Sequence, residues 1–444
     1  MALQIEVFLW GTKVGDLGYK DQPTINQPVT IFEFTTEIVK ANIEISPLLM
    51  SSKAQQHTFP EISFRTFKGL PGIFADSLPD KFGTQLIDIY MAEKGVPLNQ
   101  VTSLDRLMYI GDRGMGALEY QPSEIKTEKN DLQILDLKML NNLAGLVNKN
   151  KKELSKKLES TTDHQQALKF IRVSSSAGGA RSKALIATTP DGQLKDGTID
   201  HGIDHDYWLL KFDADNNHDR DSNDPKGMPK VEYIYSLIAK SCGIDMPRTD
   251  YIKDDNNFHF MIERFDRVKQ KGKLEKLHFV SWCGISHAHR DITGAYSYEQ
   301  LALVCKELSL GSDALKEIFK RCVFNIVGRN QDDHTKNFGF LMSKDLVWHL
   351  APAFDLTYSF DPTGKWTSTH QIRLNRKQTD FVRSDLLAFA TQCNLTAVQG
   401  SRIIDKIISE FKNFEQLANK YKVPLHLTKT ISKNLRRKCL LTTS

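Results

Sequence analysis

The pattern of hydrophobic and polar positions changes along the chain. Gln4–Leu9 alternates apolar and polar residues, and Val29–Phe34 is rich in β-branched and aromatic residues, so both segments are predicted to be strands. Over residues 80–93, apolar residues recur at helical spacing instead. The first 125 residues are therefore predicted to form a mixed α/β subdomain.

After this subdomain the pattern predicts a long amphipathic helix over about residues 131–160, whose lysine-rich end is typical of a solvated surface. Strands are predicted at Phe170–Val173, Ala184–Thr188 and Tyr207–Phe212, and a helix at Val231–Ser241. From about residue 297 the pattern is mostly helical. We therefore divide the chain into an N-terminal subdomain (1–125), a linker helix (126–165), a strand-rich region (166–295) and a helical region (296–444).

Composition excludes several classes of protein. The chain has 444 residues, of which 40% are hydrophobic and 25% charged, so it can bury a sizeable core and is not globally disordered. A net charge of +5 is too small for a dedicated nucleic-acid-binding protein. The six cysteines form no C-x-x-C pair, which argues against a zinc ribbon or a disulfide scaffold. No signal peptide or membrane-spanning run is recognisable, so a cytoplasmic protein without membrane association is expected.

The segment Asn330–Phe338 carries the most informative polar spacing. Asp332 is followed five positions later by Asn337, which matches the D-x-x-x-x-N of protein-kinase catalytic loops. In such a loop the aspartate reaches the hydroxyl proton of the phosphate acceptor, and the asparagine oxygen faces a metal ion on the phosphates. Taken alone, the same residues also fit a capping or turn cluster.

A later carboxylate, Asp355, follows an apolar, strand-like run that ends at Leu350. A carboxylate that leaves a hydrophobic segment needs a cation or hydrogen-bond donors. Mg²⁺ on nucleotide phosphates would satisfy it, because Mg²⁺ binds one or two carboxylates together with phosphates and water. A helix N-cap is the alternative for this residue.

Lys211 lies inside an otherwise apolar strand, where an ammonium group must either reach solvent or meet anions. Glu232, in the helix that follows, could form the strand-lysine to helix-glutamate pair that positions ATP phosphates in kinases. Residues 261–267 come where a kinase hinge would present backbone groups and an acid to adenine. Glu263 and Arg264 in this segment also fit ordinary surface charges.

Two glycine-containing loops need separate interpretations. Residues 174–183 contain Gly178 and Gly179, which allow backbone N–H groups to approach phosphate oxygens, while Arg181 and Lys183 add positive charge. The loop over residues 111–116 precedes the linker and is interpreted as a tight turn. The candidate elements follow one another in the order that a bilobal kinase requires: the glycine loop, the strand lysine, the helix glutamate, the hinge, the D-x-x-x-x-N loop and the later aspartate. That order predicts a kinase.

The chain resembles the HipA family of bacterial serine/threonine kinase toxins over nearly its whole length. The resemblance rests on Val7–Lys20, Phe67–Asp80, Gly178–Ala184, Glu263–Arg267 and Asn330–Phe338, of which the last two are the most specific. It implies an α+β, bilobal protein-kinase-like fold with a mixed α/β N-terminal subdomain and an all-α C-terminal lobe. It also implies a serine/threonine-protein kinase that uses ATP and Mg²⁺.

The resemblance assigns roles residue by residue. Asp332 is implied to be the proton acceptor, Asn337 and Asp355 the metal ligands, and Lys211 a contact to the ATP phosphates. The implied nucleotide-binding set comprises Ser176, Gly178, Gly179, Ala180, Arg181, Ser182, Lys183, Lys211, Glu263, Arg264, Phe265, His334, Lys336, Asn337, Phe354 and Asp355. Ser182 stands where many relatives carry proline, a departure that bears on the stiffness of the loop.

Regulation and partners are also implied by the resemblance. Ser176 corresponds to a serine whose autophosphorylation ejects the loop and inactivates the enzyme, although the adjoining Ser174 and Ser175 leave the acceptor open. A small helix-turn-helix antitoxin is implied to bind the toxin and operator DNA, so that DNA is reached only through the antitoxin. Aminoacyl-tRNA synthetases are among the family's protein substrates.

Several alternatives stay open at this point. The chain could be a pseudokinase-like co-repressor that acts with an antitoxin on DNA, or a small-molecule or lipid kinase. A metal site of His278, Cys283, His287 and His289 is disfavoured because their spacing matches no recognised zinc motif. The basic residues Lys433, Arg436, Arg437 and Lys438 are interpreted as a solvated terminal helix, with contact to DNA as the alternative.

Overall fold

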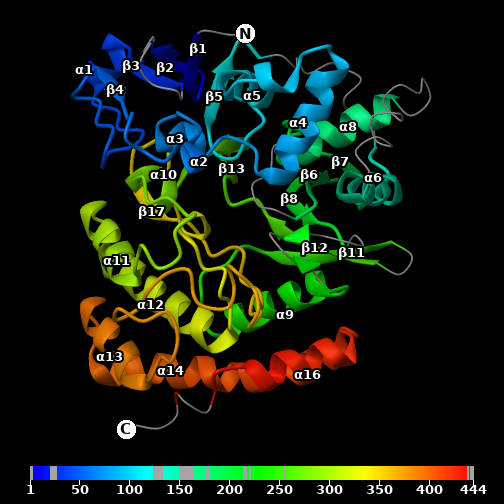
Figure 1. The fold of residues 1–444 in the computed structure, drawn as a ribbon, viewed down its shortest axis with the longest axis vertical. Coiled ribbons are helices and arrows are strands. Elements are labelled where there is room, and N and C mark those ends of the chain that lie inside the picture. Colours follow the sequence, from blue (N-terminus) through cyan, green and yellow to red (C-terminus); the bar gives the residue numbers. More distant parts are fainter. Residues whose placement is uncertain are drawn as a thin grey trace.

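The computed structural model describes residues 4–20, 28–123, 134–149, 164–175, 181–213, 218–219, 222–223, 225–254, 257–437 and 440. These residues form an N-terminal sheet domain, a second sheet with helices beside it, and a largely helical C-terminal lobe below both (Figure 1). None of the helices in these ranges combines the length and the apolar character that crossing a bilayer requires.

The N-terminal domain is built on a five-stranded antiparallel sheet with the order β4-β3-β2-β1-β5. Its strands are β1 (Gln4–Leu9), β2 (Thr12–Lys20), β3 (Val29–Phe34), β4 (Gln56–Thr58) and β5 (Leu118–Gln121). The strands predicted at residues 4–9 and 29–34 are confirmed. A Cβ atom on Gly15 would lie 2.5 Å from the ring of Phe32, so glycine at this position leaves room for that buried ring.

Helices, most of them short, connect this sheet to the region of the second sheet. They are α1 (Thr36–Ala41), α2 (Phe64–Phe67), α3 (Gly72–Ala75), α4 (Lys81–Glu93), the 3-10 turn η1 (Leu98–Gln100) and α5 (Ser103–Ile110). The helix predicted from residue 80 is confirmed as α4. It begins at the N-cap Asp80, whose carboxylate accepts a hydrogen bond from the backbone N–H of Gly83 at 2.8 Å.

The predicted linker (126–165) contains α6 (Leu137–Lys149), and a second helix, α8 (His164–Ser175), begins at its end and lies mostly in the region predicted to be strand-rich. The predicted helix is thereby confirmed for residues 137–149. Residues 134–136 are not helical, and residues 131–133 and 150–160 lie outside the described ranges. The strand predicted at Phe170–Val173 is wrong, because these residues belong to α8. Ala167, Phe170 and Ile171 share one buried face of α8 at helical spacing, and this amphipathic pattern prevails over the β propensity of the short run.

The second sheet is antiparallel, with the order β11-β12-β8-β6-β7. Its strands are β6 (Lys183–Thr188), β7 (Leu194–Asp196), β8 (Asp206–Lys211), β11 (Thr249–Asp254) and β12 (Asn257–Glu263). Trp208 and Leu210 of the central strand β8 pack with α4 and α8, whereas Phe258 and Phe260 of β12 pack with the helix α9 (Met228–Ser241) on the other face. The short pairs β9 (His218–Asp219) with β10 (Ser222–Asn223) and β13 (Arg267–Gln270) with β14 (Lys273–Lys276) extend from this region.

The C-terminal lobe is mostly helical. Its helices are α10 (Trp282–Ser286), α11 (Tyr298–Glu307), α12 (Gly311–Gly328), α13 (Arg383–Gln392), α14 (Ala397–Glu410), α15 (Phe414–Lys420) and α16 (Leu425–Asn434), with the 3-10 turns η3 (Thr335–Asn337) and η4 (Phe411–Asn413). The expected all-α lobe needs one correction. β16 (Gly339–Met342) and β17 (Trp348–Leu350) pair with β15 (His278–Ser281) in a three-stranded sheet. All four residues of β16 are buried, so this segment needs a sheet partner for its backbone polar groups.

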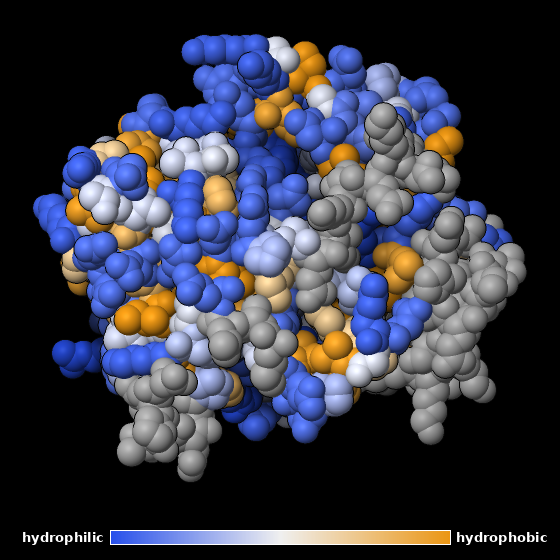
Figure 2. Space-filling view, turned by 90° about the horizontal axis from the view of Figure 1, so that it is seen from above, coloured by the Kyte–Doolittle hydropathy of each residue, from blue (hydrophilic) through white to orange (hydrophobic). Residues whose placement is uncertain are grey.

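The described surface seen from above is mainly hydrophilic, and its apolar residues form small, separate groups (Figure 2). Apolar residues such as Leu49 and Leu98 are exposed at distant positions of the chain rather than in one stretch. Scattered exposure of this kind is normal for globular proteins and does not by itself mark a docking surface.

Candidate active site

Lys211, the last residue of β8, lies between two carboxylates from different elements. Its Nζ atom is 2.5 Å from Glu232 Oε1 on α9 and also binds Asp355 Oδ1 in the segment after β17. The predicted lysine–glutamate pair is therefore formed. Exposure is 2% for the Glu232 side chain and 34% for that of Asp355, so the glutamate is buried and the aspartate faces an open side.

The charges of this group stabilise one another. Burial alone would lower the pKa of Lys211, but Asp355 and Glu232 outweigh this effect and raise the pKa above its ordinary value. For Asp355, burial raises the pKa, but Lys211, Lys183 and Arg181 prevail and lower it. Lysine and aspartate are thus both charged near neutral pH, as contact with a phosphate and with Mg²⁺ requires.

Backbone conformation fixes the place of Asp355. Its φ angle of 54° lies in the left-handed region, which non-glycine residues rarely adopt without support. Its carbonyl oxygen accepts a hydrogen bond from the side chain of Asn330 at 3.3 Å, and Asn330 lies two residues before Asp332. This contact ties the predicted metal ligand to the predicted catalytic loop.

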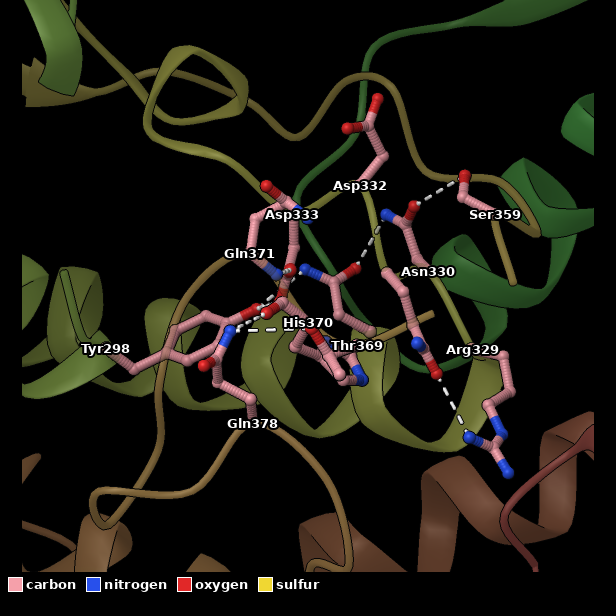
Figure 3. A network of polar contacts seen from close by, with 12 residues as sticks. Tyr298, Arg329, Asn330, Asp332, Asp333, Ser359, Thr369, His370, Gln371 and Gln378 are labelled. Carbon is pink, nitrogen blue, oxygen red and sulfur yellow. Dashed lines mark hydrogen bonds and ion pairs between the residues drawn. The ribbon is translucent and has the colours of Figure 1, made fainter. Parts of the chain in front are cut away.

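The catalytic loop follows α12, and its two adjacent aspartates are in different surroundings (Figure 3). Asp333 is fully buried and accepts hydrogen bonds from the hydroxyl of Tyr298 at 2.7 Å, from His370 Nδ1 at 2.8 Å and from the backbone N–H of Gln371 at 2.9 Å. Asp333 is therefore an anchor of the loop rather than a reacting group.

Asp332 points away from this anchor (Figure 3). One oxygen of its side chain, which is 20% exposed, lies 3.9 Å from His334 Nε2. Asn337 donates its side-chain N–H to the backbone carbonyl of Asp332 at 2.8 Å. Because the amide nitrogen is used inside the loop, the amide oxygen of Asn337 is the atom that remains for a metal ion.

The side chains of His370 and Arg436 support the catalytic loop on the side of Asp333. His370 donates from Nδ1 to Asp333, and its Nε2 accepts from the guanidinium of Arg436 at 3.0 Å. Burial lowers the pKa of His370, so the ring is neutral and can donate on one side and accept on the other. The expectation of a solvated terminal helix is wrong for Arg436, because this side chain is buried against the catalytic loop. Lys438 lies outside the described residues.

The predicted hinge, residues 261–267, is fastened to the N-terminal domain. The guanidinium of Arg264 binds Asp266 at 2.8 Å and the carbonyl oxygens of Gly114 and Gly197 at 3.1 Å. Asp266 also accepts from the backbone N–H of Gly116 at 2.7 Å. The loop over 111–116 is thus a turn, as predicted, and it also docks on the hinge. The buried side chain of Arg264 is committed to this docking, and its backbone N–H donates to the carbonyl oxygen of Tyr207 at 2.8 Å, so no contact of Arg264 to adenine is evident.

Phe265 and Phe354 come together beside the hinge. Their ring centroids are 5.6 Å apart, and the ring of Phe279 lies 5.6 Å from the first and 6.3 Å from the second. Glu263, at the end of β12, is partly exposed and lies 3.4 Å from the guanidinium of Arg248. An aromatic cluster of this kind suits a flat heterocycle.

Only part of the glycine loop lies in the described residues. Ser176, Gly178, Gly179 and Ala180 are outside them, whereas Arg181, Ser182 and Lys183 are described. Arg181 lies 3.6 Å from Glu232, next to the Lys211 group. Ser182 is buried and its carbonyl oxygen accepts from Phe212 N at 3.0 Å.

Two carboxylates of the N-terminal domain reach this region, and the sequence did not single them out. Asp80 lies 2.7 Å from Lys183 Nζ, and Asp76 lies 3.6 Å from Lys336 Nζ on the catalytic loop. Both residues lie in Phe67–Asp80, a segment that carries the family resemblance, and Asp80 also begins the predicted helix over residues 80–93. Their partners lie 103 and 260 residues away along the chain, so no local pattern reveals them.

The residues present fit Mg²⁺ better than a transition metal. Asp355 and Asn337 offer a carboxylate and an amide oxygen, which are hard ligands that Mg²⁺ prefers. Within the described ranges no three histidine, cysteine, aspartate or glutamate side chains are grouped to hold a metal ion. In the disfavoured zinc grouping, His278 bonds to the Ile45 carbonyl at 2.8 Å and His287 Nε2 accepts from Gly72 N at 3.0 Å.

Comparison with solved structures supports this architecture. The HipA chain in the Shewanella oneidensis MR-1 complex of HipA, HipB and operator DNA has a TM-score of 0.65 at 15% sequence identity, and the match covers 98% of this chain and 96% of that one. The Helicobacter pylori proinflammatory kinase CtkA matches 53% of this chain and 88% of its own, at 14% identity and a TM-score of 0.35. The first match shows a shared fold, and the second is too distant to carry an argument.

Sequence comparison gives the family. A Haemophilus influenzae protein named "Putative kinase" is 24% identical over 238 residues, which cover 47% of this chain and 69% of the relative. The family model for the HipA N-terminal domain matches residues 5–121, and the model for the HipA-like C-terminal domain matches residues 175–415. The bilobal kinase-like architecture predicted from the motifs agrees with both matches. The chain belongs to the HipA family.

Proposed function

We propose that this chain is an ATP-dependent serine/threonine-protein kinase that acts as the toxin of a toxin–antitoxin pair in the cytoplasm. The observation that carries the proposal is the Lys211–Glu232–Asp355 group, joined through Asn330 to the loop that bears Asp332. Phosphoryl transfer depends on positioning and charge neutralisation, and this arrangement supplies both.

Each side chain has a separate task in the proposed reaction. Asp332 orients the seryl or threonyl hydroxyl and accepts its proton, as a carboxylate held within hydrogen-bond reach can do. Lys211, fixed by Glu232, neutralises charge on the phosphates. Asn337 and Asp355 would hold Mg²⁺, which when bound neutralises the phosphate charge that builds up during transfer. Phe265 and Phe354 would border the adenine.

Regulation by Ser176 belongs to the same proposal. Ser174 and Ser175 are fully buried in the last turn of α8, so neither hydroxyl is presented to a nucleotide in this conformation. This burial favours Ser176 as the autophosphorylated residue. A phosphate on Ser176 adds about −1.5 to −2 charge five residues before Arg181 and seven before Lys183 in the sequence, which can draw the loop away from the nucleotide.

The partners follow from family membership. The solved Shewanella HipA structure contains HipB and operator DNA, which supports an antitoxin as the partner of this chain. The resemblance implies that this antitoxin is a helix-turn-helix protein and that DNA is reached only through it. A protein substrate, with an aminoacyl-tRNA synthetase as the first candidate, is implied by the resemblance noted above.

The test is direct. The purified full-length chain is incubated with radiolabelled ATP, Mg²⁺ and a host cell extract, and the labelled serines and threonines are mapped by mass spectrometry. The proposal expects label on protein hydroxyls, including Ser176. Binding of ATP without any transfer would support a pseudokinase co-repressor instead, and label only on small molecules or lipids would support the other alternative.

A further inference from the structure

Residues 76–80, between α3 and α4, touch both halves of the candidate site. We call this segment the strap. At its beginning, the carboxylate of Asp76 accepts hydrogen bonds from the backbone N–H and the hydroxyl of Ser281 at 2.7 and 2.9 Å, and lies 3.6 Å from Lys336 on the catalytic loop. At its end, Asp80 pairs with Lys183 on β6. The strap thus joins the N-terminal domain to both the catalytic loop and the strand that follows the glycine loop.

The Asp80–Lys183 pair is buried on both sides. The carboxylate and the ammonium are 2.7 Å apart, and their side chains are 6% and 2% exposed. Burial lowers the pKa of Lys183 and raises that of Asp80, and in each case the partner's charge opposes the effect. Each group therefore depends on the other to stay charged.

Asp80 is itself held rigidly. Its second oxygen accepts the backbone N–H of Gly83 at 2.8 Å, at the start of α4, where the helix dipole favours a negative charge. The backbone of α4 also approaches the end of α8 closely, since a Cβ atom on Gly83 would lie 2.6 Å from the carbonyl oxygen of Ser175. The carboxylate is thus fixed relative to the helix that leads into the glycine loop.

On its other side Lys183 faces the proposed phosphate site. Besides Asp80, two charged groups affect the pKa of Lys183: Asp355 raises it and Lys211 lowers it. Lys183 in turn helps to lower the pKa of Asp355. Lys183 also pairs in register with Lys211 across β6 and β8. The ammonium of Lys183 therefore lies between a carboxylate of the N-terminal domain and the ion-paired group at the centre of the site.

We propose that Asp80 is a positioning residue for phosphoryl transfer: it keeps Lys183 charged and directed toward the nucleotide phosphates. The inference deepens the proposed kinase function and rests on it. It follows that Asp80, a residue of the N-terminal domain, contributes to the nucleotide site. The kinase lobes without this domain would lack the carboxylate that positions the ammonium of Lys183.

The variant Asp80→Asn removes the charge and keeps the helix start, because asparagine caps helices about as well as aspartate. The matched control is Asp88→Asn on the same helix, where the carboxylate is 27% exposed and pairs with Arg106 at 2.7 Å. Binding of Mg-ATP to the full-length chain is measured by calorimetry between pH 6 and 9, and thermal unfolding is recorded for each variant.

For Asp80→Asn we expect Mg-ATP affinity to fall by about 10- to 100-fold at pH 8, the loss expected for one charge-assisted contact. Lys183 without its counter-charge loses its proton as the pH rises, so the affinity should recover toward the wild-type value near pH 6. Asp88→Asn should bind as the wild type does. A loss of equal size at pH 6 and pH 8 indicates a structural role only and overturns the proposal.

A double variant covers the case in which Asp80→Asn does not fold. Lys183→Met together with Asp80→Asn leaves no buried unpaired charge. If Asp80 acts through Lys183, the double variant and Lys183→Met alone should bind Mg-ATP equally, whereas a further loss in the double variant contradicts the proposal. Wild-type affinity for Asp80→Asn at every pH overturns the role of Asp80 alone, and absence of Mg-ATP binding by the wild type overturns the kinase function itself.

Discussion

Asp332 and Asp333 are neighbours in the sequence, but their carboxylates lie in opposite surroundings. Asp333 is enclosed by Tyr298, His370 and the backbone of Gln371, while Asp332 points away from them (Figure 3). Successive side chains of an extended segment point to opposite sides, so one residue can anchor the loop while the next serves the reaction. The D-x-x-x-x-N spacing predicts that Asp332 is the catalytic residue, and the hydrogen bonds give its neighbour Asp333 a structural role.

Asp333→Asn should destabilise the protein, because asparagine cannot accept all three buried hydrogen bonds and brings two N–H donors into their place. We expect a loss of about 2 to 3 kcal/mol in the free energy of unfolding, measured by denaturant titration. Asp332→Asn should change this free energy by less than about 0.5 kcal/mol. Equal losses for the two variants would contradict the division of roles.

Glu232→Gln should lower the rate of phosphate transfer by about 10²-fold, because a displacement of about 1 Å of a positioning group in a catalytic site has an effect of this size on the rate. Glu232 is the buried partner of Lys211 and also lies next to Arg181, so both cations lose their orientation together. Transfer is measured with radiolabelled ATP, beside the control Glu410→Gln, whose carboxylate pairs with Lys406 and accepts from Asn413 at 3.4 Å in the helical lobe. An unchanged rate in Glu232→Gln would show that the pair does not position the phosphates.

The protein should become less stable as the pH falls from about 6.5 to 4. Burial lowers the pKa of His287 to about 4, and its Nε2 atom accepts the backbone N–H of Gly72 from the N-terminal domain. The unfolded chain binds more protons than the folded one in this window, so the free energy of unfolding decreases as the pH drops. His287 accounts for about 2 to 3 kcal/mol of this decrease in the free energy of unfolding. Burial also lowers the pKa of His278 to about 4, so His278 adds to the decrease.

The variant His287→Asn checks this assignment. Asparagine tolerates the left-handed conformation in which His287 ends α10, with a φ angle of 49°, and it does not titrate. Unfolding free energies measured from pH 7 to pH 4 should therefore decline less steeply in the variant. The same slope in both proteins would place the acid sensitivity elsewhere.

Ser176→Ala should remove autophosphorylation, while transfer to other proteins should still be detected at the start of the incubation. The wild-type chain should lose activity during incubation with ATP as Ser176 is modified, and the variant should keep it. Mass spectrometry gives the occupancy of the site over time. Inactivation of the variant at the wild-type rate, with phosphate on Ser174 or Ser175, would assign the switch to one of these serines.

The sequence predicts the parts of this protein whose signals are local. The first strands, α4 and the lysine–glutamate pair follow from periodicity and from the order of the motifs. The strand predicted at Phe170–Val173 failed because four residues with high β propensity are too short a window to reveal the amphipathic helix that contains them.

The contacts that sequence reasoning missed join distant segments. Three buried or partly buried polar pairs are of this kind. Two of them join different domains, Asp80 with Lys183 and Asp76 with Lys336. The third joins the end of the chain to the catalytic region, Arg436 with His370. Their residues look like surface charges in the sequence, because a pattern of charge along the chain does not show which side chains fold against one another. Arg264 belongs to the predicted hinge, but its side chain binds the loop over 111–116.

The central claim is tested most directly by measuring phosphate transfer and Mg-ATP binding side by side for the wild type and Asp332→Asn. The account predicts that the wild type transfers the γ-phosphate of ATP to protein hydroxyls. In the variant, transfer should fall by about 10²- to 10⁴-fold while Mg-ATP affinity stays within about twofold of the wild-type value. Transfer at the wild-type rate by Asp332→Asn would contradict the account.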